Sequence, residues 1–234
     1  MITKHIPNTI TCLNIASGCT ATVFALQGET QLCGMPAYNW AYIFIGIAAV
    51  MDFLDGFAAR LLHAYSDMGK ELDSLCDCVS FGVAPAMLLY ATLAPQGGWL
   101  PWVAIVIPVA GALRLAKFNI DTRQTTSFIG LPIPANAIFW IGYTAYCHAG
   151  FSNLALPYIV VPVVLMESYL MLSELKLFSL KFKTWGWKGN AFRWLLIVTA
   201  IVSVIVFGVP GLMWLILAYL LYGIVDNATR SDKK

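Results

Sequence analysis

Residues 51–77 read MDFLDGFAARLLHAYSDMGKELDSLCD, and the rest of the chain is organised around them. The stretch holds six carboxylates, one arginine and two glycines inside a sequence that is otherwise strongly apolar. An ionised side chain in hydrocarbon costs several kcal/mol unless it is paired or bound to a metal. We therefore expect the acidic residues of this stretch to serve a function.

The composition of the whole chain excludes an ordinary soluble domain. Of the 234 residues, 59% are hydrophobic and only 11% are charged, and the mean hydropathy is +0.75. Such a chain has too little polar surface to stay in water. We predict an all-α polytopic membrane protein in which residues 1–234 form a single membrane domain.

Apolar runs long enough to cross about 30 Å of hydrocarbon predict a helical bundle of about eight transmembrane helices. A tight turn at Val209-Pro210-Gly211 separates the last two runs. The expected spans are 10–27, 38–62, 67–92, 98–119, 130–148, 154–173, 191–208 and 210–226. The acidic stretch lies at the junction of the second and third spans.

The fourteen Lys and Arg residues predict the orientation of this bundle. All of them fall at the two termini or near the second, fourth and sixth connections, and the opposite connections contain none. Positive charge is retained on the cytoplasmic side of membranes. We therefore expect a multi-pass protein of the cell membrane with both termini cytoplasmic and the acidic stretch facing the cytoplasm.

The sixth connection, residues 174–190, alternates Lys with Leu, Phe and Trp. This pattern is typical of a basic interfacial segment that anchors to anionic lipid headgroups. The alternative is a lid close to a site.

Helical periodicity divides the six acids into two groups. At about 100° per residue, four of them fall on the two stripes that can face each other across the junction. Asp67 and Glu71 point elsewhere. The stripe of the second span contains Asp52, Asp55, Gly56 and Ala59, with Arg60 at its edge; that of the third contains Ser66, Gly69, Asp73, Cys76, Asp77 and Ser80.

Four facing carboxylates repel one another unless protons or cations intervene. Ligands that are all oxygen favour hard divalent ions, Mg²⁺ or Mn²⁺ with Ca²⁺ as a further candidate. Four acids suit two such ions, an arrangement that serves phosphoryl displacement. Intramembrane carboxylates also form proton or cation relays in transporters, so spacing alone leaves both interpretations open.

The complete pattern is Asp52-x2-Asp55-Gly56-x2-Ala59-Arg60-x8-Gly69-x3-Asp73-x3-Asp77. It resembles the signature of the CDP-alcohol phosphotransferase family, with every fixed position filled. The resemblance implies an integral-membrane enzyme that transfers a phosphatidyl-type group from a CDP-linked lipid to an alcohol and releases CMP.

Further segments resemble the phosphatidylserine synthase branch of this family over residues 5–135. They are Ile6-Pro7-Asn8, Ser80–Pro85 (SFGVAP), Ala112–Asn119 (ALRLAKFN) and Phe128–Ala135 (FIGLPIPA). The branch implies CDP-diacylglycerol as donor, L-serine as acceptor and a catalytic core at 5–150, with 154–234 as additional helices. Family resemblance also implies a homodimer among membrane lipids, and no nucleic-acid partner is expected.

Two other functions remain to be weighed. Another acceptor, glycerol 3-phosphate or inositol phosphate, would need a denser basic pocket than Arg114 and Lys117 supply. A cation-coupled transporter would show internal repeats with broken helices, and the sequence contains no convincing repeat.

The resemblance and the chemistry together assign roles to the site residues. The four acids Asp52, Asp55, Asp73 and Asp77 are expected to bind divalent ions, and their number suggests two ions. Asp77 is also the expected general base for the acceptor hydroxyl. Contacts to the CDP-lipid are expected from Asn8, Thr11, Asp55, Gly56, Ala59, Arg60 and Gly69. Contacts to the acceptor are expected from Ser80, Arg114, Lys117 and Asn119. Glu167, a second intramembrane acid, is expected to pair with Arg114 or Lys117.

Overall fold

The computed structural model describes residues 5–121, 127–178, 186 and 190–231 of the chain. Within these residues the protein is almost entirely helical, which confirms the predicted all-α class. Helical segments occupy all eight places where the sequence predicts them. They divide into two compact units, Met1–Leu115 (unit 1) and Ala116–Lys234 (unit 2), with the boundary inside helix α5.

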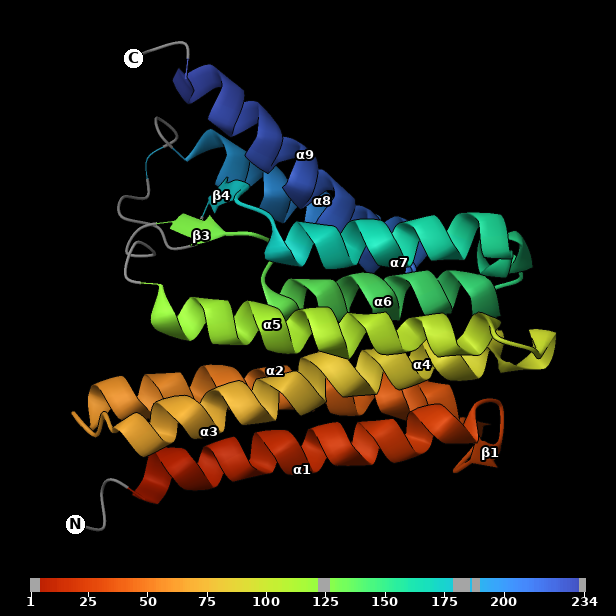
Figure 1. The fold of residues 1–234 in the computed structure, drawn as a ribbon, viewed down its shortest axis with the longest axis horizontal. Coiled ribbons are helices and arrows are strands. Elements are labelled where there is room, and N and C mark those ends of the chain that lie inside the picture. The colour runs from red at the N-terminus through yellow and green to blue at the C-terminus, as the bar shows by residue number, and fades with distance from the viewer. Residues whose placement is uncertain (1–4, 122–126, 179–185, 187–189, 232–234) are drawn as a thin grey trace. The chain divides into compact units, whose positions relative to one another are not determined.

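Unit 1 begins with two helices joined by a short hairpin. Helix α1 (His5–Gln27) leads through strands β1 (Gln31–Leu32) and β2 (Met35–Pro36) into helix α2 (Ala37–Leu61). The strands pair antiparallel, and the two helices run side by side (Figure 1). Small residues such as Ala21, Ala41 and Ala48 are fully buried, which lets the helices approach closely.

The third long helix of unit 1 is continuous but changes from α to π and back to α geometry along its length. Helix α3 (Asp67–Asp77) passes into the π-helix η2 (Cys78–Val83) and then into α4 (Ala84–Leu93) and the 3₁₀ turn η3 (Ala94–Gln96). Pro85, near the start of α4, has no N–H to give to a carbonyl one turn earlier. A local π register accommodates such an interruption without ending the helix.

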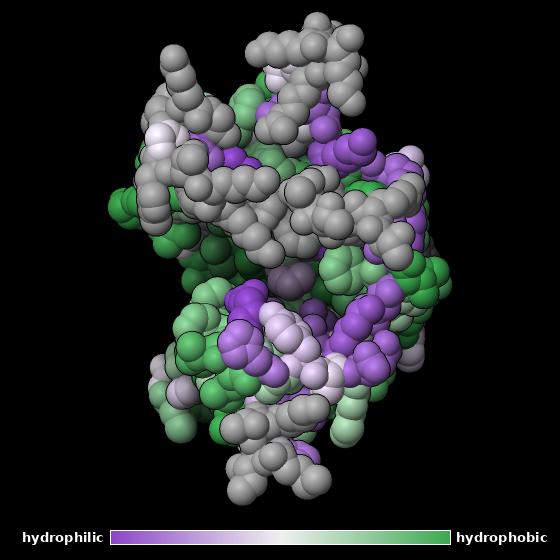
Figure 2. Space-filling view, turned by 90° about the vertical axis from the view of Figure 1, so that its left-hand side faces the viewer, coloured by the Kyte–Doolittle hydropathy of each residue, from purple (hydrophilic) through white to green (hydrophobic). Residues whose placement is uncertain are grey.

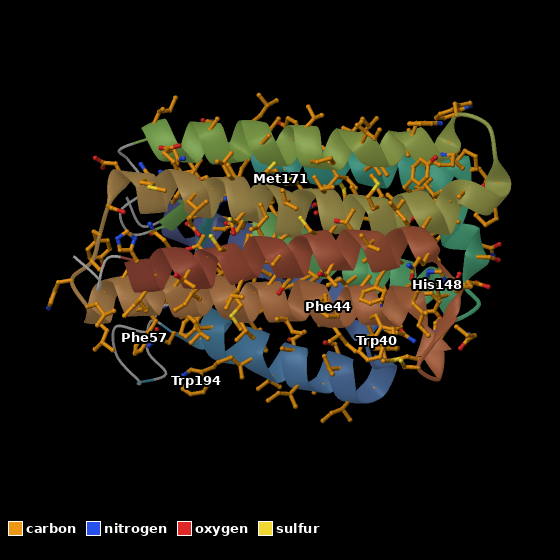
Figure 3. All side chains as sticks on the ribbon, turned by 90° about the horizontal axis from the view of Figure 1, so that it is seen from below. Trp40, Phe44, Phe57, His148, Met171 and Trp194 are labelled. Carbon is orange, nitrogen blue, oxygen red and sulfur yellow. The ribbon has the colours of Figure 1, made fainter. Side chains whose placement is uncertain are left out.

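Unit 1 closes with the 3₁₀ helix η4 (Leu100–Ile105), which runs directly into α5 (Val106–Ile120). Aromatic rings gather at the hairpin end of α2: Phe24 packs against Trp40 and Phe44 with centroids 6.1 and 5.5 Å apart. Figure 3 shows Trp40 and Phe44 towards that end of α2 and Phe57 near the opposite end. Asp52 and Asp55 belong to this second end of the helix.

Unit 2 contains the remaining helices and a second short sheet. Its elements after α5 are β3 (Ser127–Ile129), α6 (Ile133–His148), η5 (Ser152–Ala155), α7 (Pro157–Leu172), β4 (Lys176–Phe178), α8 (Ala191–Phe207) and α9 (Gly211–Ser231). Strands β3 and β4 pair antiparallel with Phe128 opposite Leu177. The turn predicted at Val209-Pro210-Gly211 is present, and α9 packs against α6 where Gly142 meets Met213.

Among the described residues, five helical segments are long and apolar enough to cross a membrane by length and composition. They are His5–Gln27, Ala37–Leu61, Asp67–Gln96, Leu100–Ile120 and Gly211–Thr229, and shorter apolar helices occupy Pro157–Leu172 and Ala191–Phe207. A multi-pass membrane protein is therefore supported. Of the predicted basic segment 174–190, the residues Lys181, Lys183 and Lys188 lie outside the described residues.

Candidate active site

The first half of the site lies where α2 ends. Asp52 and Asp55 are on the last three turns of α2, one helical turn apart. Beyond Leu61 the backbone N–H of Ala64 donates to Ala59 O at 2.9 Å, and that of His63 donates to Arg60 O at 3.3 Å. His63 has a φ of 49°, so the helix stops in a left-handed residue with its last carbonyls satisfied. This termination reverses the chain towards α3.

The second half of the site starts with the N-cap of α3. The Ser66 side chain accepts a hydrogen bond from the Gly69 N–H at 3.0 Å, which satisfies one of the free donors of the first turn. The helix then carries Asp73 and Asp77 four residues apart, on one face. Asp67 and Glu71 are exposed, as their helical phase predicts.

Three carboxylates from the two helices converge. Asp52, Asp55 and Asp73 each offer an oxygen, and these oxygens lie within 4.8 Å of one another. Asp52 and Asp73 are within hydrogen-bonding reach of each other. Asp55 Oδ2 and Asp73 Oδ1 are buried and have no hydrogen-bond partner in the described part of the chain. Buried, unpartnered oxygens from two acids, with the carboxylate of a third beside them, are a donor set that fits a hard divalent cation.

Asp77 lies one turn further along α3 and is only 9% exposed. It is outside the group of three, although its charge interacts with those of Asp52 and Asp73. Asn14 of α1 donates from Nδ2 to Asp77 Oδ1 at 3.5 Å, and Arg114 of α5 is close enough to attract the carboxylate. Asp77 thus lies one turn beyond Asp73 and is not among the residues that line the neighbouring cavity.

A cavity of about 220 Å³ opens beside these carboxylates, at the end of unit 1 where α1 begins and α2 ends. Figure 2 looks onto this end, and hydrophilic side chains gather in its lower half, over unit 1, between apolar flanks. The lining comes from three helices and the connection between two of them. Its residues are Pro7, Asn8, Thr11, Asp55, Gly56, Ala59, Ala64, Tyr65, Ser66, Gly69, Lys70 and Asp73.

Six of the seven residues predicted to contact the CDP-lipid line this cavity: Asn8, Thr11, Asp55, Gly56, Ala59 and Gly69. The seventh, Arg60, is exposed and is not among the lining residues. Thr11 lies beside Asp55, while its hydroxyl donates to Pro7 O at 3.0 Å.

The two glycines of the pattern have different surroundings. A β-carbon built on Gly56 would meet nothing within 4 Å, so the space in front of it belongs to the cavity. A β-carbon on Gly69 would lie 3.0 Å from Ser66 Oγ and 3.1 Å from Asn8 Oδ1. Gly69 therefore lies in a tight contact with Ser66 and Asn8, whereas Gly56 leaves room for a ligand.

The residues predicted to bind the acceptor are not gathered at the cavity. Ser80 is fully buried, and its hydroxyl donates to the backbone oxygen of Asn14 at 3.1 Å. Arg114 is 7% exposed and faces Asp77 in unit 1. Lys117 and Asn119 belong to unit 2 and are half-buried near the end of α5.

The expected partner of Glu167 needs correction in one respect. Lys117 forms an ion pair with Glu174 at 2.7 Å and also donates to Leu172 O at 3.3 Å. Glu167 is fully buried on α7, and neither of its side-chain oxygens has a hydrogen-bond partner among the described residues. Lys117 prefers Glu174 because that carboxylate lies beyond the end of α7, where both charges keep contact with solvent.

The sequence did not single out three residues that the structure brings to the site. Tyr65 and Lys70 line the cavity, and Asn14 reaches Asp77. Tyr65 and Lys70 flank the N-cap of α3, between the two halves of the acidic pattern. This position in the sequence could have indicated that they lie close to the site. Asn14 follows Thr11 by three residues on α1, so it shares a face with a predicted site residue.

Comparison with known proteins identifies a family for this chain. The model of the CDP-alcohol phosphatidyltransferase family matches residues 4–173 of the chain. A CDP-diacylglycerol–serine O-phosphatidyltransferase of Mycobacterium leprae is 42% identical over 151 residues, which are 60% of this chain and 46% of the relative. The chain spans about half the length of the mycobacterial relatives that it matches.

Two relatives of the same name are covered more completely. The Bacillus subtilis protein is 40% identical over 145 residues, 58% of this chain and 73% of the relative. The Methanocaldococcus jannaschii protein is 33% identical over 197 residues, 84% of this chain and 87% of the relative. With the family model across most of the chain and all signature residues in place, the chain belongs to the CDP-alcohol phosphatidyltransferase family.

Proposed function

We propose that the protein transfers a phosphatidyl group from CDP-diacylglycerol to the hydroxyl of L-serine, forming phosphatidylserine and releasing CMP. The observation that carries the proposal is the cavity bordered by Asp55 and Asp73, with Asp52 beside them, in a chain of this family. The acceptor is inferred from the names of the three relatives and from the four sequence segments that resemble the serine-using branch.

The carboxylates of Asp52, Asp55 and Asp73 would hold the divalent cations, with Asp77 near them. Two cations, Mg²⁺ or Mn²⁺ with Ca²⁺ as the alternative, suit this number of acids. When bound, the cations supply positive charge that offsets the charge of the diphosphate and of the departing nucleotide.

The chain's own residues provide the nucleotide site. Gly56 and Ala59 present helix backbone without large side chains, so that the nucleotide can lie against α2, and Gly69 lines the same cavity from α3. Asn8 and Thr11 offer polar contacts from α1, and Arg60 at the rim offers charge to phosphate. The acyl chains of the donor remain in the bilayer.

Asp77 is the general base in this proposal. The serine hydroxyl attacks the lipid-side phosphorus, a new P–O bond forms, and the bond from that phosphorus to the bridging oxygen of CMP breaks. Asp77 accepts the hydroxyl proton, which matters because a neutral hydroxyl is a poor nucleophile at pH 7. Arg114 can hold the serine carboxylate in a bidentate contact, with Lys117, Asn119 and Ser80 as further predicted contacts.

The proposed setting is the cell membrane, with the site on the cytoplasmic side. Arg60 and Lys70 both lie at the cavity end of unit 1, at the end of α2 and the start of α3, which supports this orientation by the positive-inside rule. Both termini are then cytoplasmic. A homodimer remains a proposal based on the family.

The test is release of CMP from CDP-diacylglycerol by the purified protein with Mg²⁺ or Mn²⁺, measured with and without L-serine. The proposal predicts CMP that depends on both serine and the divalent ion. If glycerol 3-phosphate or inositol phosphate stimulates the release of CMP and serine does not, the same site uses a different acceptor.

A further inference from the structure

Helix α1 packs closely against the third long helix of unit 1 next to Asp77. We call this contact between Asn14 and Gly18 on one side and Ser80 on the other the seam. Asn14 and Gly18, one turn apart on α1, are both buried, and so is Ser80 on the facing helix. A β-carbon on Gly18 would collide with both the side chain and the backbone of Ser80. The seam therefore holds α1 and the residues that follow Asp77 at a fixed separation.

The seam lies where the third long helix changes from α to π geometry. Asp77 is the last residue of α3, and the π-helix η2 begins at Cys78. A π turn is wider than an α turn and is rare, and single π turns occur frequently at functional sites. The Ser80 hydroxyl ties this turn to α1 by its bond to the Asn14 backbone oxygen, at 3.1 Å. The direction in which Asp77 projects is thereby fixed relative to Asn14.

The Asn14 side chain reaches Asp77 itself. Its Nδ2 donates to Asp77 Oδ1 at 3.5 Å, a long hydrogen bond of the kind that tightens when a substrate binds. Its Oδ1 is completely buried and has no hydrogen-bond partner in the described residues. A buried carboxamide oxygen is normally paired, so its vacancy beside a carboxylate of the site indicates a donor that arrives with a ligand.

We propose that Asn14 is a positioning residue for the acceptor step: its N–H holds the Asp77 carboxylate. Its side-chain oxygen receives a hydrogen bond from a donor of the acceptor other than the hydroxyl whose proton Asp77 takes. The inference rests on the proposed function, because it assumes an acceptor with O–H or N–H donors. An amide suits the position because it donates to a carboxylate and accepts from a substrate at once. The donor lipid occupies the cavity on the far side of Asp73 and does not depend on Asn14.

The experiment compares Asn14→Leu and Asn14→Asp with the wild type, and uses Thr20→Val as a control. Leu keeps the volume and removes both polar atoms, whereas an ionised Asp keeps the oxygen and removes the N–H. Thr20 lies on the same helix and its hydroxyl only donates back to Ala16 O at 2.8 Å. Four quantities are measured: kcat, the KM for serine, the affinity for CDP-diacylglycerol without serine, and the melting temperature.

For Asn14→Leu we expect kcat to fall roughly 100-fold, the loss typical of a misplaced catalytic group, together with a higher KM for serine. Affinity for CDP-diacylglycerol should match that of the wild type, and Thr20→Val should match it in every quantity. Asn14→Asp should lose kcat at least as severely, because a second carboxylate faces Asp77.

Three results would overturn the inference. The first two are an unchanged kcat in Asn14→Leu and a fully active Asn14→Asp. The third is an Asn14→Leu variant that loses affinity for CDP-diacylglycerol and melting temperature along with kcat, because this would indicate a role in packing alone. Failure of the proposed function is distinguishable, because the wild type itself would then show no serine-dependent CMP release.

Discussion

Asn8 of α1 and Gly69 of α3 lie close together in the lining of the cavity, and a β-carbon on Gly69 would lie 3.1 Å from the Asn8 side-chain oxygen. Ser66 Oγ, the N-cap of the same helix, would lie 3.0 Å from that carbon. The absence of a side chain at Gly69 thus allows these two polar side chains to approach the backbone of α3 closely. Gly56, on the opposite wall, has no such neighbour.

The two glycines can be separated by substitution. Gly56→Ala should keep or raise the melting temperature, because alanine favours a helix interior by about 1 kcal/mol over glycine. It should raise the KM for CDP-diacylglycerol, since the new methyl group enters the cavity. Gly69→Ala should also raise this KM, and its melting temperature should lie below that of Gly56→Ala, because Asn8 Oδ1 or Ser66 Oγ must move to admit the methyl group. Equal melting temperatures with equal KM values would contradict this distinction.

The seam between Gly18 and Ser80 makes a prediction about stability. Gly18→Ala should lower the free energy of unfolding by about 1–3 kcal/mol, the usual range for overpacking a tight interior. The matched control is Gly46→Ala on α2, where a β-carbon meets nothing within 4 Å and no loss is expected. Thermal melting in detergent measures both. A stable Gly18→Ala variant would show that the helices are less closely held than the structure has them.

The group of Asp52, Asp55 and Asp73 predicts a metal-dependent gain in stability. A ligand that binds only the folded state at 100 times its dissociation constant stabilises it by about 2.7 kcal/mol. Mn²⁺ should therefore raise the melting temperature of the wild type, and Asp73→Asn should lose most of this increase. Asp67→Asn, which removes an exposed acid six residues earlier, should retain it. A full Mn²⁺ response in Asp73→Asn would exclude Asp73 as a ligand.

Arg114 and Lys117 should differ in their effect on the acceptor step. Arg114 is 7% exposed and faces Asp77, whereas the side chain of Lys117 is 39% exposed and pairs with Glu174. A hydrogen bond to a charged group contributes about 1.5–3 kcal/mol, so Arg114→Met should lower kcat/KM for serine by roughly 10- to 100-fold. Lys117→Met should lower stability by no more than about 1 kcal/mol. A larger loss of kcat/KM for serine in Lys117→Met than in Arg114→Met would contradict this prediction.

Much of the fold could be predicted from the sequence because its signals are local. Apolar runs placed all eight helical segments, and the proline-glycine turn before α9 appeared where expected. Helical phase also brought Asp52, Asp55 and Asp73 to one side of the α2–α3 junction, since the turn between the helices is short. The same argument placed Asp67 and Glu71 on the exposed side.

Features that depend on contacts between distant segments could not be predicted in this way. The bond from Asn14 to Asp77 joins residues 63 positions apart, and the bond from Lys117 to Glu174 spans 57. The π turn after Asp77 ends two residues before Pro85, and apolar periodicity does not predict a change from α to π winding. The pairing of β3 with β4 also escaped prediction, because strands of three residues carry too short a pattern.

The central claim is the transfer of a phosphatidyl group to serine, and the most direct test follows the serine itself. Purified protein is incubated with CDP-diacylglycerol, Mn²⁺ and isotopically labelled L-serine, and labelled lipid and CMP are quantified together. We predict one labelled lipid for each CMP released, and neither product with Asp77→Asn. CMP without label in the lipid fraction, or no CMP at all from a folded wild-type protein, would contradict the account.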